Sequence, residues 1–447
     1  MTFPITDATP ARFTGPLPAA CDVVVIGGGI IGVMTAWHLA DRGLKVTLCE
    51  KGLIAGEQSS RNWGWIRQQG RDFAELPIMM ESLAQWRALA QDFGPALGFR
   101  QDGVLYLAKT DRELAGFEDW LAKARPLGVD SHMMSRAEVA ARIPAAATPW
   151  LGALHTPSDA RAEPWIAVPT LVTGAVRRGV TVLEHCAVRS LDLAAGRVAG
   201  VVTERGRIAC DQVVVASGAW SALFLRACDV HIPQLAVLAS VAATEPMPEV
   251  FAGNAADDDF AFRRRQDGGY SIAPGGAHDY FVGPDSFRNF KHFLPVLKKD
   301  FRSTTFRPMA PHGFPDAWTT PRRWQPDEVS PFERIRILNP KPNMKIISQV
   351  QDSFAKCFPT LGRPRLRAAW AGMIETMPDV VPVIDRTPAI PGLVIATGLS
   401  GHGFGIGPGM GRVIADLVAD RPTGHDLSRF RLSRFTDGSR LVPGPSL

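Results

Sequence analysis

The pattern of apolar and polar positions near the start of the chain predicts a strand, a helix and a second strand. An apolar run at 23–26 meets a glycine cluster at 27–32. Apolar residues at helical spacing follow as far as Gly43, and a second apolar run at 46–49 ends at Glu50. This order of periodicities is typical of a βαβ unit, in which two parallel strands flank a crossover helix.

Helical and strand-like periods alternate along the rest of the chain. Helical spacing is found at 75–92, 111–125, 135–142 and 164–178, and strand-like runs at 103–108 and 181–217. Residues 236–365 are rich in proline and in strand signals, with a predicted hairpin at 257–276 that turns at Asp267-Gly268-Gly269. The segment 392–420 reads as strand, glycine loop and helix. The sequence therefore predicts an α/β protein in which a strand-rich region interrupts the βαβ-type segments.

Composition narrows the class of protein. Of the 447 residues, 46% are hydrophobic and 21% charged, and the net charge is +5, which suits a globular chain with a large core. No basic stripe with interleaved aromatics suggests nucleic-acid binding, and no apolar run is long enough to span a membrane. The six cysteines form no CxxC pair, which disfavours a zinc or thioredoxin-like site. With no signal peptide evident, we expect a cytoplasmic protein.

The glycine cluster carries the first chemical signal. Gly27, Gly29 and Gly32 form a GxGxxG motif between a predicted strand and a predicted helix. The first glycine permits a tight turn, the second lets the backbone approach a pyrophosphate, and the third allows close helix–strand packing. Glu50 lies 21 residues after Gly29, where its carboxylate can accept hydrogen bonds from the ribose hydroxyls of an adenosine. The motif predicts a dinucleotide site and disfavours a 2′-phosphate.

Four segments resemble the D-amino-acid oxidase-like superfamily, in particular its sarcosine oxidase and glycine oxidase branch, with a looser likeness to L-pipecolate oxidases. They occur in the family's order at 56–64, 213–221, 368–385 and 398–405. The resemblance implies a Rossmann-type FAD domain of the p-hydroxybenzoate-hydroxylase kind, with an inserted mixed-sheet substrate domain. We expect the FAD domain at 20–94, 146–235 and 366–425, the substrate domain at 95–145 and 236–365, and extended termini at 1–19 and 426–447.

The motif and the resemblance together imply a set of FAD-contacting residues. Those expected are Gly27, Gly29, Ile30, Ile31, Gly32, Glu50, Lys51, Ser59, Ser60, Arg61, Asn62, Trp63, Val188, Ser217, Gly218, Trp220, Gly372, Gly401, His402, Gly403, Phe404 and Gly405. For Trp63, a place in the core is slightly favoured over one in the wall of the flavin pocket. The glycine loop 401–409 brings backbone N–H groups toward the flavin, and a helix expected from about Pro408 points its positive end there. The relatives that bind flavin covalently carry a cysteine at the position of Gly372, so we expect non-covalent FAD.

The resemblance implies oxidation of an amine C–N bond to an imine, which water hydrolyses, so the flavin performs the chemistry and no metal is expected. Candidate substrate-side residues are Arg67, His402, Glu375, Arg264 and Tyr270. Arg67 or Arg264 would hold the carboxylate of a secondary or N-substituted amino acid, whereas Glu375 would suit a substituted diamine. The electron acceptor is either oxygen or a quinone or protein. A non-catalytic FAD-binding subunit of a larger complex is the alternative from another class.

Overall fold

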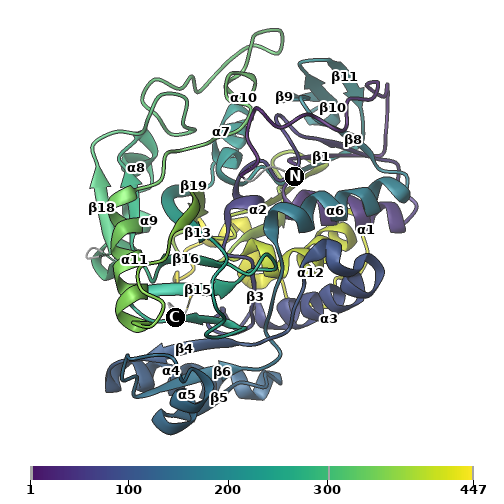
Figure 1. The fold of residues 1–447 in the computed structure, drawn as a ribbon. Helices are drawn as coiled ribbons and strands as arrows, with labels where there is room; N and C mark the ends of the chain where they lie inside the picture. The colour runs from purple at the N-terminus through teal and green to yellow at the C-terminus, as the bar shows by residue number, and fades with distance from the viewer. Residues whose placement is uncertain (1–3, 301–302, 445–447) are drawn as a thin grey trace.

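A computed structural model describes residues 4–300 and 303–444 (Figure 1). It has two main sheets, and the predicted mixed α/β class is confirmed. The first sheet has six strands in the order β20-β21-β12-β1-β2-β8, parallel throughout except for β20. Its strands are β1 (Val23–Ile26), β2 (Val46–Cys49), β8 (Thr181–Leu183), β12 (Gln212–Val215), β20 (Val383–Arg386) and β21 (Leu393–Thr397).

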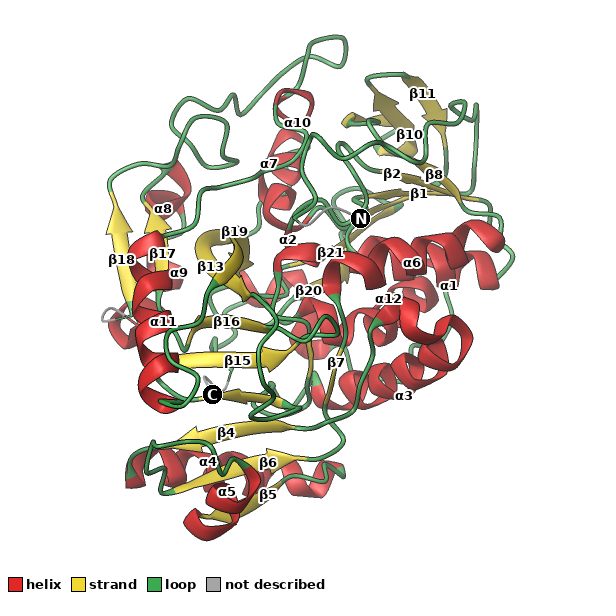
Figure 2. Cartoon of the chain, viewed as in Figure 1, coloured by secondary structure: helices red, strands yellow, loops and turns green. Residues whose placement is uncertain are grey.

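Both faces of the first sheet are covered, which explains why its strands read as continuous apolar runs. Val23 and Val25 belong to a core cluster that also contains residues of four helices, which gather on the right of Figure 2. These are α1 (Ile30–Asp41), α3 (Leu76–Phe93), α6 (Pro164–Arg177) and α12 (Gly403–Val418). Val24 and Ile26 face a small antiparallel sheet and a short helix. These elements are β9 (Val188–Ala194), β10 (Arg197–Thr203), β11 (Gly206–Ala209) and α7 (Ser221–Ala227).

The second sheet is larger and mostly antiparallel, and it occupies the left and lower parts of Figure 1. Its strands follow the order β18-β17-β13-β16-β15-β14-β4-β6-β5, and β19 pairs with β13 over ten residue pairs. They are β4 (Val104–Ala108), β5 (His132–Ser135), β6 (Gly152–Thr156), β13 (Leu235–Thr244), β14 (Asn254–Ala256), β15 (Phe260–Arg264), β16 (Tyr270–Pro274), β17 (His278–Phe281), β18 (Thr304–Arg307) and β19 (Leu366–Thr376).

The remaining helices, strands and turns complete the chain. They are the helices α2 (Gln58–Arg61), α4 (Asp111–Ala124), α5 (Arg136–Arg142), α8 (Pro284–Arg288), α9 (Phe290–Asp300), α10 (Pro331–Arg334) and α11 (Met344–Cys357), the strands β3 (Trp65–Ile66) and β7 (Ala160–Arg161), and the 3-10 turns Gly94–Leu97, Arg125–Leu127, Gly218–Trp220, Ser428–Phe430 and Leu432–Phe435. Helix α4 begins where its sequence predicts because Thr110 and Glu113 form a reciprocal capping box. The predicted hairpin is β15–β16, with Gly268 in the left-handed region of its turn.

Three details differ from expectation. Helix α12 begins at Gly403 rather than near Pro408, so the expected glycine loop is largely helix. Helix α11 occurs inside the segment that read as strand-rich, and its apolar residues Ile347, Val350 and Phe354, spaced i, i+3 and i+7, form a buried stripe. Strands β6 and β19 pair within the second sheet, although both lie in segments expected in the FAD domain. The division into two domains stays a prediction.

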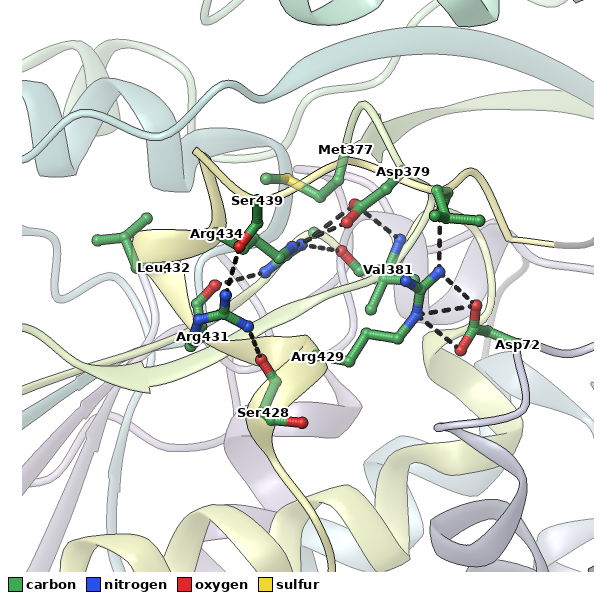
Figure 3. Close-up of polar contacts among 12 residues, drawn as sticks. Asp72, Met377, Asp379, Val381, Ser428, Arg429, Arg431, Leu432, Arg434 and Ser439 are labelled. Atoms are coloured by element: carbon green, nitrogen blue, oxygen red, sulfur yellow. Dashed lines mark hydrogen bonds and ion pairs between the residues drawn. The ribbon is translucent and has the colours of Figure 1, made fainter. Parts of the chain in front are cut away.

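The C-terminal segment is not simply extended, as the sequence had suggested. Its two 3-10 turns bury Phe430 and hold two arginines against carboxylates elsewhere in the chain (Figure 3). Arg429 pairs with Asp72, and Arg434 pairs with Asp379. The segment therefore fastens the residues before α3 to the turn after β19.

No helix among residues 4–300 and 303–444 is long and apolar enough to cross a membrane. The same residues hold no cluster of histidine, cysteine or acidic side chains suited to a metal ion. Their six cysteines are all free thiols.

Candidate active site

A cavity of about 1010 Å³ runs between the two sheets. At one end it is lined by the glycine loop after β1, by Glu50 at the end of β2 and by Val188 at the start of β9. It then passes the start of α12 and reaches β4 and α4. A single cavity thus contains most of the predicted cofactor residues and several of the predicted substrate residues.

Packing explains the glycines of the predicted phosphate loop. Gly27 has a positive φ of 113°, and a Cβ there would overlap the carbonyl oxygen of Ala216. A Cβ at Gly32 would overlap the carbonyl oxygen of Gly27, so the third glycine lets α1 lie directly against β1. The N–H of Ile30 donates to Ser59 Oγ at 2.9 Å. The loop is therefore a tight turn that leads into the N-terminus of α1 at the cavity wall.

Glu50 lies in the cavity wall beside this loop. Its two carboxylate oxygens accept hydrogen bonds from the backbone N–H groups of Gly28 and Gly52, each at 2.7 Å. Burial raises the pKa of Glu50 above its ordinary value. Because each carboxylate oxygen has a second lone pair, the side chain is fixed in orientation and still able to accept from a hydroxyl in the cavity.

Lys51 and Trp220 are held by a residue that sequence reasoning missed. The Glu57 carboxylate accepts from Lys51 Nζ at 2.6 Å and from Trp220 Nε1 at 3.0 Å. Lys51 Nζ also lies 4.4 Å from the Trp220 ring centroid. Glu57 lies in the segment that resembles the family, but a single acidic residue in a polar stretch gives no separate signal. All three side chains line the cavity.

The segment after Glu57 divides into residues that face the cavity and residues that support it. Ser59, Asn62 and Trp63 line the cavity, whereas Ser60, expected to contact the cofactor, does not. The reason is that α2 turns the Ser60 side chain inward, where Oγ donates to the carbonyl oxygen of Glu57 at 3.3 Å. Arg61 lines the cavity, but its guanidinium donates to the carbonyls of Gly56, Ala371 and Ile5 and to Asn339 Oδ1.

The start of α12 forms another wall of the cavity. Its first turn, Gly403–Gly405, lines the cavity together with the preceding residues 399–402. A Cβ at Gly405 would lie 3.0 Å from Ile66 Cα, so the glycine permits close approach of β3 to the helix. The unpaired backbone N–H groups of this first turn give the helix its partial positive end. The N-terminus of α12, which carries this partial positive charge, was expected near Pro408 and lies at Gly403.

Arg67 and His402 meet in the cavity although 335 residues separate them. Arg67 Nη2 lies 3.2 Å from His402 Nε2, and its guanidinium lies 5.7 Å from the Tyr106 ring centroid. Burial, followed by the charges of Arg67 and Arg71, holds the pKa of His402 well below its ordinary value. A neutral imidazole can accept a hydrogen bond from Arg67, so His402 orients the guanidinium without adding a second charge.

The backbone around Arg67 is fixed by buried polar groups. Arg71 donates from Nε to the carbonyl oxygen of Arg67 at 2.7 Å and from Nη2 to that of His402 at 2.8 Å. Asp159 accepts from the backbone N–H of Gln68 at 2.7 Å. Neither Arg71 nor Asp159 was singled out in the sequence, because their partners lie far away along the chain.

Glu375 lines the cavity but is occupied by protein partners. One carboxylate oxygen accepts from Gln58 Nε2, and the other accepts from the Leu399 N–H at 3.2 Å. Burial raises the pKa of Glu375 above its ordinary value. The side chain therefore links α2 to the loop before α12, and each carboxylate oxygen keeps a second lone pair.

Two of the substrate-side candidates lie outside the cavity, as does Gly32 of the predicted cofactor set. Arg264 and Tyr270 are paired in register on the face of β15 and β16 that packs against α11, and strand alternation turns that face away from the cavity. Arg264 Nη1 donates to the carbonyl oxygen of Met247 at 2.9 Å, and the Tyr270 hydroxyl donates to that of Phe251 at 3.2 Å. Neither side chain therefore reaches the cavity that holds the other candidates.

An aromatic wall extends from Arg67 toward α4. The ring centroids of Trp63 and Trp65 are 5.3 Å apart, those of Trp65 and Tyr106 are 6.4 Å apart, and those of Tyr106 and Phe117 are 6.1 Å apart. All four side chains line the cavity. Tyr106 and Phe117 were not predicted, because an apolar residue in a strand or helix reads as core. We call the part of the cavity beside these four rings the aromatic arm, and its apolar lining suits a bulky apolar group.

Known proteins resemble this chain over most of its length. The family model described as DAO, FAD dependent oxidoreductase, matches residues 22–417. The solved structure of the L-amino acid deaminase from Proteus myxofaciens in complex with anthranilate superposes with a TM-score of 0.90 at 31% identity, covering 95% of this chain and 97% of that one.

Two curated relatives are also similar. Mouse mitochondrial sarcosine dehydrogenase is 25% identical over 441 residues, which is 96% of this chain and 43% of that protein. The sarcosine oxidase subunit beta of Rhizobium meliloti is 25% identical over 424 residues, which is 93% of this chain and 89% of that protein. The chain thus spans less than half the length of the sarcosine dehydrogenase. The resemblance read from its four segments is confirmed, and the chain belongs to the DAO family of FAD dependent oxidoreductases.

Proposed function

We propose that this chain binds FAD non-covalently and oxidises the C–N bond of an amino acid to an imine, which water then hydrolyses. The observation that carries the proposal is the Arg67–His402 pair, a guanidinium in the same cavity as the dinucleotide-type glycine loop. Family membership supplies the redox chemistry, since a bound flavin accepts the hydride. The residues of the chain bind and orient the cofactor and the substrate, and they exclude water from the cavity.

The residues at the glycine-loop end of the cavity fit FAD. Glu50 is fixed by two backbone N–H groups and can accept from a ribose hydroxyl, and the N-terminus of α1 provides positive potential for a pyrophosphate. The first turn of α12 provides a second positive end in the cavity, suited to the negative charge that a reduced flavin carries. Gly372 lines the cavity with no thiol to offer, which supports non-covalent binding.

The substrate end of the cavity fits an amino acid. We assign the substrate carboxylate to Arg67, because a buried carboxylate requires a cation and Arg264 lies outside the cavity. The substrate side chain then occupies the aromatic arm beside Tyr106. The alternative of a substituted diamine would place its second ammonium near Glu375, which lines the same cavity, and flavin bleaching by each compound separates the two substrates. The similar deaminase from Proteus myxofaciens, whose structure holds the aromatic carboxylate anthranilate, also supports an amino-acid substrate with a bulky side chain.

Anaerobic bleaching of the bound flavin tests the proposal. The panel contains L-phenylalanine, L-leucine, pipecolate, sarcosine and an acylated diamine, each with wild type, Arg67→Ala and Arg264→Ala. Loss of one charge-assisted contact costs about 2–3 kcal/mol, so Arg67→Ala should lower kcat/KM about 30- to 150-fold. Arg264→Ala is the matched control and should stay within about twofold. Bleaching by the diamine alone, or equal activity of Arg67→Ala, would overturn the assignment.

The same panel read with and without oxygen separates an oxidase from a dehydrogenase that reduces a quinone or protein. A non-catalytic FAD-binding subunit would show no bleaching by any amine. We also propose a cytoplasmic location, which the free thiols of all six cysteines support.

A further inference from the structure

The cavity continues beyond Arg67 to a part of the protein that no motif indicated. This far end, which we call the α4 end, lies between the first two turns of α4, the β14–β15 turn and the residues after β16, in the lower part of Figure 2. Its lining residues are Thr110, Arg112, Glu113, Gly116, Phe117, Asp257, Asp258 and Gly275. Arg112 and Asp258 are exposed, so the cavity reaches solvent here.

Gly116 is an unexpected residue at this place. A glycine inside a helix lowers stability by about 0.5–1 kcal/mol relative to alanine, so it usually occurs where packing or backbone geometry requires it. At Gly27, Gly32 and Gly405 an added Cβ would meet a neighbouring backbone atom, but at Gly116 it would meet nothing within 4 Å. The fold therefore does not require this glycine. It leaves open space on the wall of the cavity.

Neighbouring side chains show where a larger residue at position 116 would project. Glu113, Gly116 and Phe117 lie on one face of α4, because residues three and four apart are neighbours on a helix. All three line the cavity, and the Phe117 ring ends the aromatic wall that begins near Arg67. A large side chain at position 116 would project next to Glu113 into the part of the cavity between the exposed Arg112 and the Phe117 ring.

The α4 end also carries an excess of negative charge. Glu113, Asp257 and Asp258 contribute three carboxylates to the lining and Arg112 one guanidinium. Lys109 lies close by, but its Nζ is shared between Asp257 at 2.8 Å and Asp259 at 2.5 Å. Partial burial and the adjacent Glu113 carboxyl raise the pKa of Asp258 to about 6, so the group is mostly ionised at neutral pH.

We propose that substrate enters through the α4 end, that the missing side chain at Gly116 keeps this entrance wide, and that its carboxylates disfavour molecules with a second negative charge. The positive groups of the site, Arg67 and the start of α12, then lie further inside. A zwitterionic amino acid passes a negative entrance and meets a cation at the binding position. The proposal rests on the proposed function for the identity of the substrate, but not for the position of the entrance.

The width of the entrance is tested with Gly116→Trp, with Gly116→Ala and Ala115→Trp as matched controls. Ala115 is the exposed neighbour on α4 and does not line the cavity. With the FAD-loaded protein, we expect Gly116→Trp to lower the second-order rate of flavin reduction by L-phenylalanine at least tenfold. Both controls should stay within about twofold. Equal rates for Gly116→Trp and Ala115→Trp would overturn the proposed entrance.

A second measurement needs no amino-acid substrate. The bound flavin is photoreduced without oxygen and reoxidised by 1,4-naphthoquinone, and Gly116→Trp should again slow this step at least tenfold relative to Ala115→Trp. If no amino acid of the panel reduces the flavin of wild type while the quinone result holds, the proposed function is wrong and the proposed entrance is still supported. If the quinone rate is unchanged in Gly116→Trp, the entrance is wrong whatever the substrate.

Charge selection is tested with Asp258→Asn, because Glu113 also caps α4 and is unsuited to substitution. The rates with 1,4-naphthoquinone and its 2-sulfonate are compared in wild type and variant at low ionic strength, where surface charges act furthest. We expect the variant to raise the sulfonate rate about threefold or more and to leave the neutral quinone unchanged. If the variant raises the reoxidation rate equally for both quinones, or changes neither rate, the proposed role of the carboxylates is wrong.

Discussion

The ion pair between Arg434 and Asp379 gives the sharpest prediction about the fold. Arg434 Nε donates to Asp379 Oδ2 at 2.8 Å and Nη2 donates to Oδ1 at 3.1 Å, so the contact is bidentate (Figure 3). Nη2 and Nη1 also donate to the carbonyl oxygens of Val381 at 2.7 Å and Arg431 at 2.9 Å. The two charged side chains are 4% and 1% exposed. Water therefore cannot replace the partner that a substitution removes.

The magnitude follows from this burial. Removing one partner of a buried pair leaves an uncompensated charge and costs about 3–5 kcal/mol. Arg434→Ala should lower the free energy of unfolding by that amount. The double variant Arg434→Leu/Asp379→Leu should recover a large part of the loss, because it removes both charges and fills the space with apolar groups.

A matched control pair is available on the surface. Arg323 and Asp229 are 2.5 Å apart, but their side chains are 65% and 78% exposed. Solvent screens such a pair, so Arg323→Ala should produce no measurable change despite its short distance.

Urea denaturation monitored by tryptophan fluorescence measures both effects. FAD is kept at one saturating concentration, because a ligand that binds only the folded state stabilises it. Equal midpoints and slopes for Arg434→Ala and Arg323→Ala would refute the reasoning that burial, rather than distance, decides the strength of these pairs. A double variant less stable than Arg434→Ala would show instead that Asp379 stabilises the fold through its own contact, the hydrogen bond that it accepts from the Val381 N–H at 3.3 Å.

Three further predictions concern the cavity. Glu50→Ala should weaken FAD binding by about 1.5–3 kcal/mol, or roughly 10- to 150-fold in Kd, measured by fluorescence titration of the apoprotein, and an unchanged Kd would refute the ribose role. Acid precipitation should release all flavin into the supernatant, whereas a flavin-sized mass increment on the chain would disprove non-covalent binding. Because the pKa of His402 is lowered in the folded state, the unfolded chain binds more protons below its ordinary pKa of about 6.5. Stability should therefore fall as pH drops from 7 to 5, less steeply in His402→Gln, and equal slopes would contradict this.

The sequence by itself determined the local elements that neighbouring residues specify. The βαβ unit follows from two apolar runs and a glycine turn, and β1, α1 and β2 lie at their predicted positions because the two strands are buried on both faces. The start of α4 follows from its capping box, which needs only Thr110 and Glu113. Most residues predicted to contact FAD line one cavity, because the motif and the family segments each specify a backbone shape at short range.

Only the tertiary structure decided which side chains share the cavity. Arg67 and Arg264 were equal candidates in the sequence, and the face of the strand turned toward the cavity separates them. The start of α12 was misplaced because glycine and proline disfavour a helix locally, whereas Trp86 and Ser82 of α3 hold the carbonyl oxygen of Gly405 and stabilise its first turn. Glu57, Tyr106 and Gly116 gave no signal, since their roles depend on residues far along the chain. Local propensity is encoded within a few residues, but a cavity is formed by packing between elements, and its lining is therefore a property of the whole fold.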